Sequence, residues 1–204
     1  MNKKEHWNNI YSTKKINEVS WYQRVPETSL ELIKNAASTS NSKIIDIGGG
    51  DSFLADNLLK EGFRDVTVLD ISSNAIEKAK NRLGEKTLNV DFIVSDIIDF
   101  EATSTYDIWH DRAVFHFLTE QDQISRYKLL VKNAIKPGGH LIIGTFSENG
   151  PDKCSGIAIS KYSMQELTEL FSDDFSLENS FQELHSTPFN TEQEFTFVVL
   201  KRLR

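Results

Sequence analysis

The residues best suited to chemistry stand at Asp46, Gly48, Gly49 and Gly50, where an acidic residue is followed by three consecutive glycines. Glycine adopts positive φ angles and places no Cβ between the backbone and a ligand. An apolar run ends at this turn, and helical spacing of apolar residues resumes at Phe53, so the pattern predicts a strand, a tight turn and a helix. The free N–H groups of such a helix point toward the turn. We therefore interpret this corner as a ligand-binding site.

Two common glycine-rich motifs do not fit the turn. The dinucleotide fingerprint needs a third glycine at the position where Phe53 stands. A P-loop needs Gly-Lys-Ser or Gly-Lys-Thr after the turn, and none follows. What remains is an acidic residue, Asp46, inside the end of the strand, followed by Gly48 and Gly50.

A second acid, Asp70, ends the next apolar run and lies 20 residues after Gly50. A carboxylate about that far past a glycine turn is placed to accept hydrogen bonds from ribose hydroxyls. The alternative is that Asp70 caps the following helix. Since Ser72 or its neighbours can supply that cap, we favour the ribose role, with Ile71 lying against the base.

A third acid, Asp96, ends the third strand of the series, although a solvated turn acid is the alternative there. A polar cluster then follows the fourth strand at His110, Asp111 and Arg112. His116 stands among aromatic residues, where a wall residue is the simpler interpretation. Two histidines six residues apart have no recognised ligand spacing, so we expect no metal.

The elements that must position these residues alternate between strand and helix, which favours a parallel sheet. Strands are expected in the apolar run that ends at Gly48 and at 66–69, 90–94, 106–109, 140–146, 175–181 and 194–201. Helices are expected from Phe53 through Leu59 and at 73–83, 120–133 and 162–171. The last two strands are expected to be antiparallel, with His185 in the loop between them.

Several short motifs together resemble those of the class I, seven-stranded S-adenosylmethionine-dependent methyltransferases, and in particular a small bacterial single-domain branch. They are Asp46-x-Gly48-x-Gly50, with Ser52 where that family has a third glycine, Trp7-x-x-x-Tyr11, Ser20-Trp21-Tyr22-Gln23, Lys136-Pro-Gly-Gly and Gly150-Pro-x-x-Cys154-Ser-Gly. The resemblance covers almost the whole chain. It implies an α/β fold with a doubly wound, mostly parallel seven-stranded sheet, helices on both faces and a C-terminal antiparallel hairpin.

The resemblance also implies a cofactor, S-adenosylmethionine, and residues that bind it. In that family, aromatic rings close over the methionine end, an acid after the third strand accepts from the adenine amino group, and the next residue offers its N–H to the adenine ring. The expected cofactor-binding residues are Trp7, Tyr11, Trp21, Asp46, Gly48, Gly49, Gly50, Asp70, Ile71, Asp96, Ile97 and His110.

The implied activity is transfer of a methyl group to a small-molecule or protein side-chain acceptor. An amine or hydroxyl acceptor must lose a proton, and the candidate catalytic residues that could accept it are His110, Asp111, His116 and His185. His185 is as readily an ordinary loop histidine. The alternative function is a non-catalytic member that binds cofactor or a partner. A nicotinamide oxidoreductase is disfavoured by Phe53.

Composition sets the outer limits. The 204 residues, 39% hydrophobic and 26% charged, suit one domain, with 1–42 as a cap or lid segment and 43–204 as the core. A net charge of -7 disfavours nucleic acid as a partner. One cysteine, Cys154, cannot form an internal disulfide, and no apolar run is long enough to span a membrane. We expect a cytoplasmic enzyme. The sequence does not indicate its oligomeric state.

Overall fold

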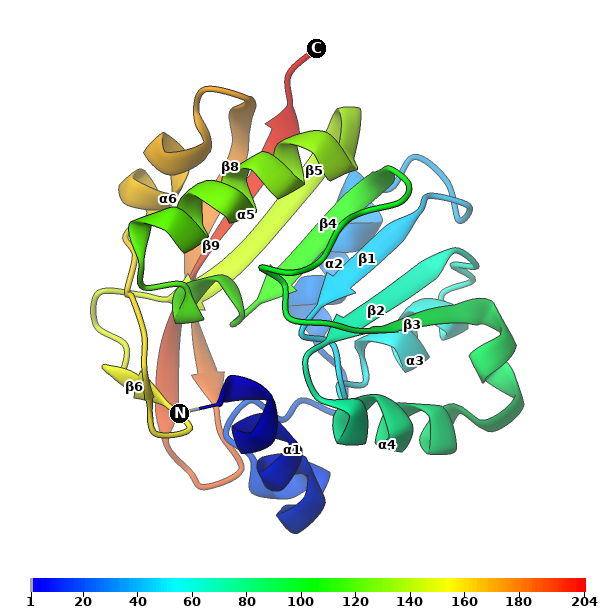
Figure 1. The fold of residues 1–204 in the computed structure, drawn as a ribbon. Helices are drawn as coiled ribbons and strands as arrows, with labels where there is room; N and C mark the ends of the chain where they lie inside the picture. Colours follow the sequence, from blue (N-terminus) through cyan, green and yellow to red (C-terminus); the bar gives the residue numbers. More distant parts are fainter. Residues whose placement is uncertain (1) are drawn as a thin grey trace.

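A computed structural model describes residues 2–204 and shows a twisted seven-stranded sheet between two layers of helices (Figure 1). The strands of this sheet are β1 (Ile44–Ile47), β2 (Val66–Asp70), β3 (Val90–Val94), β4 (Tyr106–Arg112), β5 (Ile135–Phe146), β8 (Phe175–Ser186) and β9 (Glu192–Arg202). A separate two-stranded hairpin consists of β6 (Lys153–Cys154) and β7 (Ile157–Ala158).

The helices lie before, between and after the strands. They are α1 (Lys3–Thr13), α2 (Glu27–Ala36), α3 (Leu54–Lys60), α4 (Ser73–Leu83), α5 (Gln121–Ala134) and α6 (Met164–Phe171), with short 3₁₀ turns at Ile16–Glu18, Gly84–Asn89 and Phe115–Phe117. Helix α6 begins two residues later than the sequence predicts, because Ser163 and Glu166 form a capping box at its start.

The strand order is β3-β2-β1-β4-β5-β9-β8. The five strands from β3 to β5 are parallel, and β9 is antiparallel to both of its neighbours. The predicted fold class is therefore confirmed, including the C-terminal hairpin. The chain leaves β1 toward β2 and β3 and later returns to place β4 on the other side of β1. This is the topological switch point of the sheet, where α/β proteins bind ligands.

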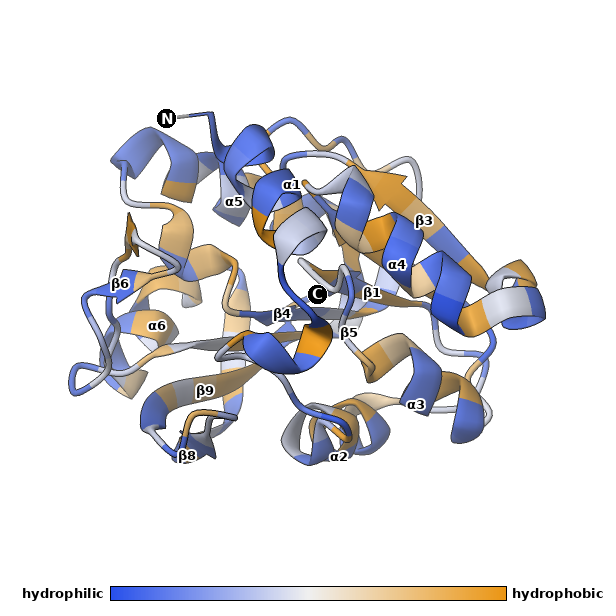
Figure 2. Cartoon of the chain, turned by 90° about the horizontal axis from the view of Figure 1, so that it is seen from below, coloured by the Kyte–Doolittle hydropathy of each residue, from blue (hydrophilic) through white to orange (hydrophobic). Residues whose placement is uncertain are grey.

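Neighbouring residues of each strand face different cores. Ile44 of β1 belongs to a core under α2, α3 and α4, whereas Ile45 belongs to a core under α5 and α6. Figure 1 shows α5 in front of the sheet and α2 and α3 behind it. In Figure 2, hydrophobic and hydrophilic residues alternate around α3 and α4, because each helix is apolar only toward the sheet. The inner strands β1 and β2 are thereby buried on both faces, whereas most residues of the edge strands β3 and β8 are exposed or half-buried.

Four strands, β4, β5, β8 and β9, extend further than predicted. Strand β4 continues through Arg112 because its last residues pair with β5, Arg112 lying opposite Gly144. Strand β5 begins at Ile135 rather than at 140. Strands β8 and β9 also lengthen, so His185 pairs with Gln193 inside the ladder and does not lie in a loop. The correction at β4 matters most, because residues on a strand point alternately to its two faces.

Candidate functional site

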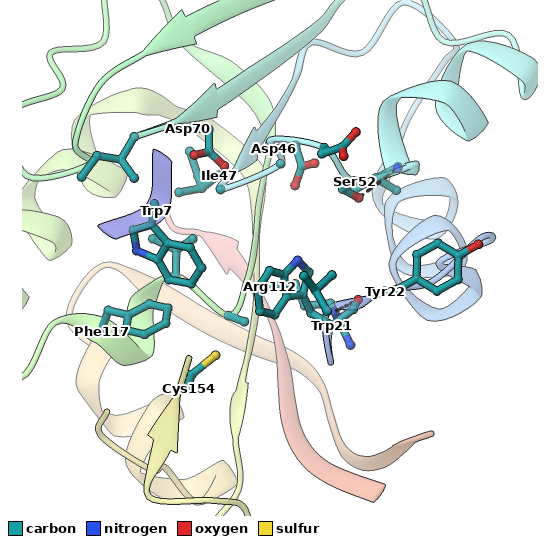
Figure 3. A pocket seen from close by; sticks show the side chains of 18 of the residues that line it. Trp7, Trp21, Tyr22, Asp46, Ile47, Ser52, Asp70, Arg112, Phe117 and Cys154 are labelled. Atoms are coloured by element: carbon teal, nitrogen blue, oxygen red, sulfur yellow. Dashed lines mark hydrogen bonds between the residues drawn. The ribbon is translucent and has the colours of Figure 1, made fainter. Parts of the chain in front are cut away.

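A cavity opens at the carboxyl ends of β1 and β4 (Figure 3), at the end of the sheet where α1 lies (Figure 1). The predicted cofactor-binding residues line it, with the exception of Gly50: Trp7, Tyr11, Trp21, Asp46, Gly48, Gly49, Asp70, Ile71, Asp96, Ile97 and His110. These residues come from the N-terminal segment and from the ends of four parallel strands. The fold therefore brings distant parts of the predicted set together in one place.

The glycine turn is shaped by two residues with positive φ, Gly48 at 67° and Gly50 at 27°. A Cβ on Gly48 would collide with the side chain of Val114. A Cβ on Gly50 would collide with the carboxylate of Asp70. Gly50 thus lies outside the cavity wall, and its lack of a side chain leaves room for Asp70.

An arginine from α4 holds the turn in place. Arg82 donates to the carboxylate of Asp51, to the carbonyl of Ser52 at 2.7 Å and to Asp56 Oδ2 at 2.9 Å. Its guanidinium also lies 4.4 Å from the centre of the Phe53 ring. No motif in the sequence indicates this role, because Arg82 is separated from its partners by an intervening strand.

Asp70 is a buried carboxylate with an unusual pKa. Its Oδ1 accepts a hydrogen bond from the Ser72 N–H at 2.7 Å. Burial, together with the nearby charge of Asp46, raises the pKa of Asp70 to about 7, although the bond from Ser72 opposes the shift. Helix α4 is capped by Ser72, whose hydroxyl accepts from the Ala75 N–H. Asp70 is therefore not the helix cap, which leaves its carboxylate available to the cavity.

A chain of three buried polar side chains joins β1, β4 and α2. His110 and Asp46 are opposite each other in the parallel ladder, and His110 Nδ1 lies 2.7 Å from Asp46 Oδ1. The other ring nitrogen, Nε2, lies 2.9 Å from the hydroxyl of Ser29. In a neutral ring, Nδ1–H donates to the carboxylate and Nε2 accepts from Ser29. Ser29 also lines the cavity, and no sequence signal marked it because its partners are on distant strands.

The far end of the cavity lies beyond β2 and β3. Ile71 and Ile97 line it with apolar side chains, and Ile97 is buried. Asp96 also lines the cavity, and its Oδ1 accepts from the N–H of Ile98 at 3.1 Å. Two aliphatic side chains beside a carboxylate suit a flat, nitrogen-rich ring that carries an amino group.

Aromatic rings from the N-terminal segment form a roof over the cavity. The ring centre of Trp7 lies 6.3 Å from Tyr11, 5.7 Å from Trp21 and 5.5 Å from Phe117. Burial raises the pKa of Tyr11 well above its ordinary value, so its phenol is neutral. The expectation that Trp7 and Tyr11 lie one helical turn apart on one face of a helix is met.

The roof is attached on two sides. On one side, Asn8 Oδ1 accepts from the Ser72 hydroxyl at 2.8 Å, and the Asn8 carbonyl accepts from Asn74 Nδ2 at 3.0 Å. On the other side, Lys3 Nζ donates to the carbonyl of Phe117 at 3.3 Å. Helix α1 therefore bridges from the start of α4 to the turn that follows β4.

Asp111, a predicted proton acceptor, faces away from the cavity. It is buried under α5, where it accepts hydrogen bonds from the Tyr127 hydroxyl at 2.6 Å and from the backbone N–H groups of Val114 and Phe115. Burial raises the pKa of Asp111 to about 6. Its neighbours on the strand point toward the cavity, so the difference follows from the two-residue period of β4.

His116 and His185 are also absent from the cavity wall. His116 is packed against the rings of Phe117 and Phe146, and burial lowers its pKa to about 3. Neither ring nitrogen of His116 has a hydrogen-bond partner among residues 2–204. His185 donates from Nε2 to the carbonyl of Ser20 at 2.7 Å. Neither histidine is positioned to take a proton from an acceptor in the cavity.

Another part of the cavity wall comes from β4 and from the segments that follow it in the chain. Arg112, Phe146, Cys154 and Phe195 line it. Cys154 is buried, and burial raises the pKa of its thiol to about 12, so the sulfur stays protonated. Cys154 is thus a buried thiol and also part of the cavity wall.

Residues 2–204 contain neither a metal-binding cluster nor a membrane-spanning helix. No group of three or more His, Cys, Asp or Glu side chains in this range is arranged to hold a metal ion. None of the helices in this range has the length and apolar character needed to cross a membrane.

Comparison with known proteins identifies the family. A family model described as a methyltransferase domain matches residues 38–197. The chain belongs to this family. The matched residues include the whole glycine turn and the ends of β1 to β5.

Individual relatives are distant. Malonyl-[acyl-carrier protein] O-methyltransferase 2 of Ilyobacter polytropus is 28% identical over 107 residues, which are 52% of this chain and 40% of that protein. Ubiquinone biosynthesis O-methyltransferase of Rickettsia bellii is 27% identical over 123 residues, 60% of this chain and 50% of that protein. The chain thus spans half or less of the length of these curated relatives.

Solved structures share the fold. One, described for conversion of a disulfide bond into a thioacetal group during echinomycin biosynthesis, has a TM-score of 0.78 at 20% identity and covers 98% of this chain and 93% of its own. The N-methyltransferase NodS of Bradyrhizobium japonicum, in complex with S-adenosyl-L-homocysteine, has a TM-score of 0.72 at 16% identity. The match covers 97% of this chain and 98% of the NodS chain.

Proposed function

We propose that this protein is an S-adenosylmethionine-dependent methyltransferase whose cofactor occupies the cavity at the switch point of the sheet. The observation that carries the proposal is the convergence of three carboxylates, Asp46, Asp70 and Asp96, from three adjacent strands on one side of a cavity roofed by aromatic rings. Membership of the methyltransferase domain family supports it.

The residues fit the parts of this cofactor. Asp70 can accept hydrogen bonds from the ribose hydroxyls, and Ile71 and Ile97 can enclose the adenine, with Asp96 near its amino group. The backbone at Gly48 and Gly49 gives the methionine portion close approach. The faces of Trp7 and its neighbours in the roof suit the cationic sulfonium, since aromatic rings attract positive charge.

The sulfonium of the bound cofactor makes its methyl group electrophilic. The protein then has to orient the acceptor in line with the sulfur–methyl bond and to exclude water, which the roof of α1 can do. For an acceptor that must lose a proton, we assign the relay of Ser29, His110 and Asp46, because it lines the cavity. A proton that reaches Ser29 Oγ can pass to His110 Nε2, and Asp46 stabilises the resulting imidazolium.

We propose a small molecule as the acceptor. The cavity lies under α1. The wall that would contact the acceptor consists of the apolar side chains of Phe146 and Phe195, the thiol of Cys154 and the guanidinium of Arg112. The net charge of -7 gives no general attraction for nucleic acid. A free thiol at Cys154 suits a reducing compartment and supports a cytoplasmic location.

Calorimetry tests the cofactor site. We expect S-adenosylmethionine and S-adenosylhomocysteine to bind with micromolar affinity, and Asp70→Ala to weaken that binding by about 1–3 kcal/mol, the range for an unpaired polar group. The matched control is Asp91→Ala, since Asp91 is exposed on the neighbouring strand β3. Failure of the native protein to bind either compound, or tighter binding of NAD, would contradict the proposal.

Turnover separates an enzyme from a non-catalytic cofactor-binding protein. Formation of S-adenosylhomocysteine would be followed with a panel of hydroxyl, amine and thiol compounds. Cofactor binding without turnover of any of these three classes of compound would favour the non-catalytic alternative. If turnover is found, a lower rate in His110→Gln would support the proton relay.

A further inference from the structure

Arg112 occupies an unusual position in the acceptor side of the cavity. It lies two residues after His110 on β4 and so projects from the same face of the strand. Its guanidinium lies 4.5 Å from the centre of the Phe195 ring, and Nη1 donates to the carbonyl of Trp21 at 3.5 Å. Figure 3 shows Arg112 inside the pocket, in this view between Asp46 and Cys154.

One end of this guanidinium has no partner. Nη2 is fully buried and makes no hydrogen bond to any residue in the range 2–204. A buried donor without an acceptor is costly, and a buried charged donor more so, so such groups in proteins are normally paired. Burial lowers the pKa of Arg112 only to about 10, so the side chain is a cation at neutral pH.

Two acids, Glu183 and Asp46, lie near this cation and favour its charged form, but neither forms an ion pair with it. Arg112 takes part in none of the ion pairs found among residues 2–204. Asp46 Oδ1 is bonded to His110, and Glu183 Oε1 accepts from Thr28 Oγ1 at 2.6 Å, while Glu183 Oε2 is buried without a hydrogen-bond partner in the same range. The neighbouring thiol of Cys154 is protonated.

The cavity wall carries basic as well as acidic side chains. The acids at the ends of β1, β2 and β3 lie at the proposed cofactor side. Lys3, Lys14 and Lys15 from the N-terminal segment line the cavity as well. Together with Arg112, these lysines favour a molecule that carries negative charge.

We propose that Arg112 is the anion-binding subsite of the methyl acceptor and holds a carboxylate on that substrate through its guanidinium. This inference rests on the proposed function and adds the chemical class of the acceptor. The ring of Phe195 keeps the guanidinium plane fixed, and the same wall offers apolar contact from Phe146 to the body of the substrate. A planar guanidinium suits a carboxylate better than a point charge does.

The carboxylate could also be the one on the methionine portion of the cofactor, and a first experiment distinguishes the two sources. S-adenosylhomocysteine carries that carboxylate and 5′-methylthioadenosine lacks it. We expect Arg112→Met to change the affinity of both compounds by less than threefold, as measured by calorimetry. A loss of tenfold or more for S-adenosylhomocysteine alone would assign Arg112 to the cofactor and overturn the proposal.

A second experiment measures the subsite itself with benzoate as the probe and benzamide as its uncharged match. With the protein saturated with S-adenosylhomocysteine, we expect benzoate to bind at least tenfold more tightly than benzamide, and Arg112→Met to remove that preference. Arg112→Lys should keep part of it, and the control Arg64→Met, at an exposed loop position, should keep all of it.

The results separate two claims, the anion subsite at Arg112 and the methyltransferase function. Equal binding of benzoate and benzamide, or no benzoate binding to a protein that does bind S-adenosylhomocysteine, would overturn the anion subsite and leave the methyltransferase proposal standing. Failure to bind S-adenosylhomocysteine would instead remove the proposed function. Thermal unfolding checks that both Arg112 variants are folded. If Arg112→Met does not fold, the partial loss of the benzoate preference in Arg112→Lys decides the question.

Discussion

Asp70 and Asp111 are both buried carboxylates near the carboxyl ends of parallel strands, and burial raises the pKa of each, to about 7 and about 6. Their hydrogen bonds differ. Asp111 has three donors, from Tyr127 and two backbone N–H groups, and faces a helix. Asp70 has one, from Ser72, and faces the cavity.

The difference teaches that a shifted pKa does not by itself locate a binding site. Both shifts have burial as their largest cause. What distinguishes the two acids is the acceptor capacity left over after the protein's own donors are counted. Asp111 uses its capacity within the protein to fix the turn after β4, whereas Asp70 keeps capacity for a ligand.

The largest effect should come from Asp111→Ala. This variant leaves the Tyr127 hydroxyl and the N–H groups of Val114 and Phe115 without their acceptor, so we expect the free energy of unfolding to fall by about 2–4 kcal/mol. Asp70→Ala, measured by the same urea titration, should not lower it by more than about 1 kcal/mol, because the variant loses one hydrogen bond and also removes a carboxylate that destabilises the folded protein when ionised. Equal losses in the two variants would erase the distinction.

Asp70→Asn tests the ligand side of the comparison. The amide keeps the size of the side chain but replaces one acceptor oxygen with a donor, so we expect S-adenosylmethionine to bind about tenfold more weakly, or about 1.4 kcal/mol. Asp111→Asn, where it remains folded, should leave the affinity within about threefold, measured by calorimetry. A stronger effect at Asp111 than at Asp70 would reverse the assignment.

The affinity for S-adenosylmethionine should rise with pH. Ribose hydroxyls donate best to an ionised carboxylate, and with a pKa of about 7 the ionised fraction of Asp70 increases about threefold between pH 6.5 and 7.5. Calorimetry at these two pH values measures the change, and Asp70→Asn should show a flat profile.

The same group acts on stability with the opposite sign. The folded-state pKa of Asp70 lies above its ordinary value of 3.8, so the folded protein binds the proton more tightly than the unfolded chain. This group therefore lowers stability as pH rises from about 4 to 7. Native protein should lose stability relative to Asp70→Asn over that range, and a gain would contradict the raised pKa.

The smallest effect should come from His116→Leu. His116 is buried, neutral and without hydrogen-bond partners, so removing its ring nitrogens should leave the free energy of unfolding unchanged or raise it by up to about 1 kcal/mol. Cofactor affinity should not change. A loss of affinity would mean that a strongly shifted pKa had marked a functional residue after all.

The parts of the site that depend on local signals could be predicted from the sequence. The glycine turn, the acids that end successive strands and the Ser72 cap of α4 are all written in residues within a few positions of one another. Apolar alternation and turn residues were sufficient to predict the parallel sheet and the final hairpin.

The parts that depend on pairing between distant segments could not. Strand β4 runs on to Arg112 because β5 is there to pair with it, and only that extension decides that His110 and Arg112 face the cavity while Asp111 does not. Ser29 and Arg82 reach the site from helices whose packing no short motif records. His185 was expected in a loop for the same reason.

The distribution of the three tryptophans has an optical consequence. Trp7 and Trp21 belong to the roof of the cavity, whereas Trp109 is buried in the other core, where its indole donates to the Tyr127 hydroxyl. A ligand beneath the roof changes the surroundings of two indoles and leaves the third unaltered. Intrinsic fluorescence can therefore report ligand entry without a label, and Trp109 provides a constant internal background.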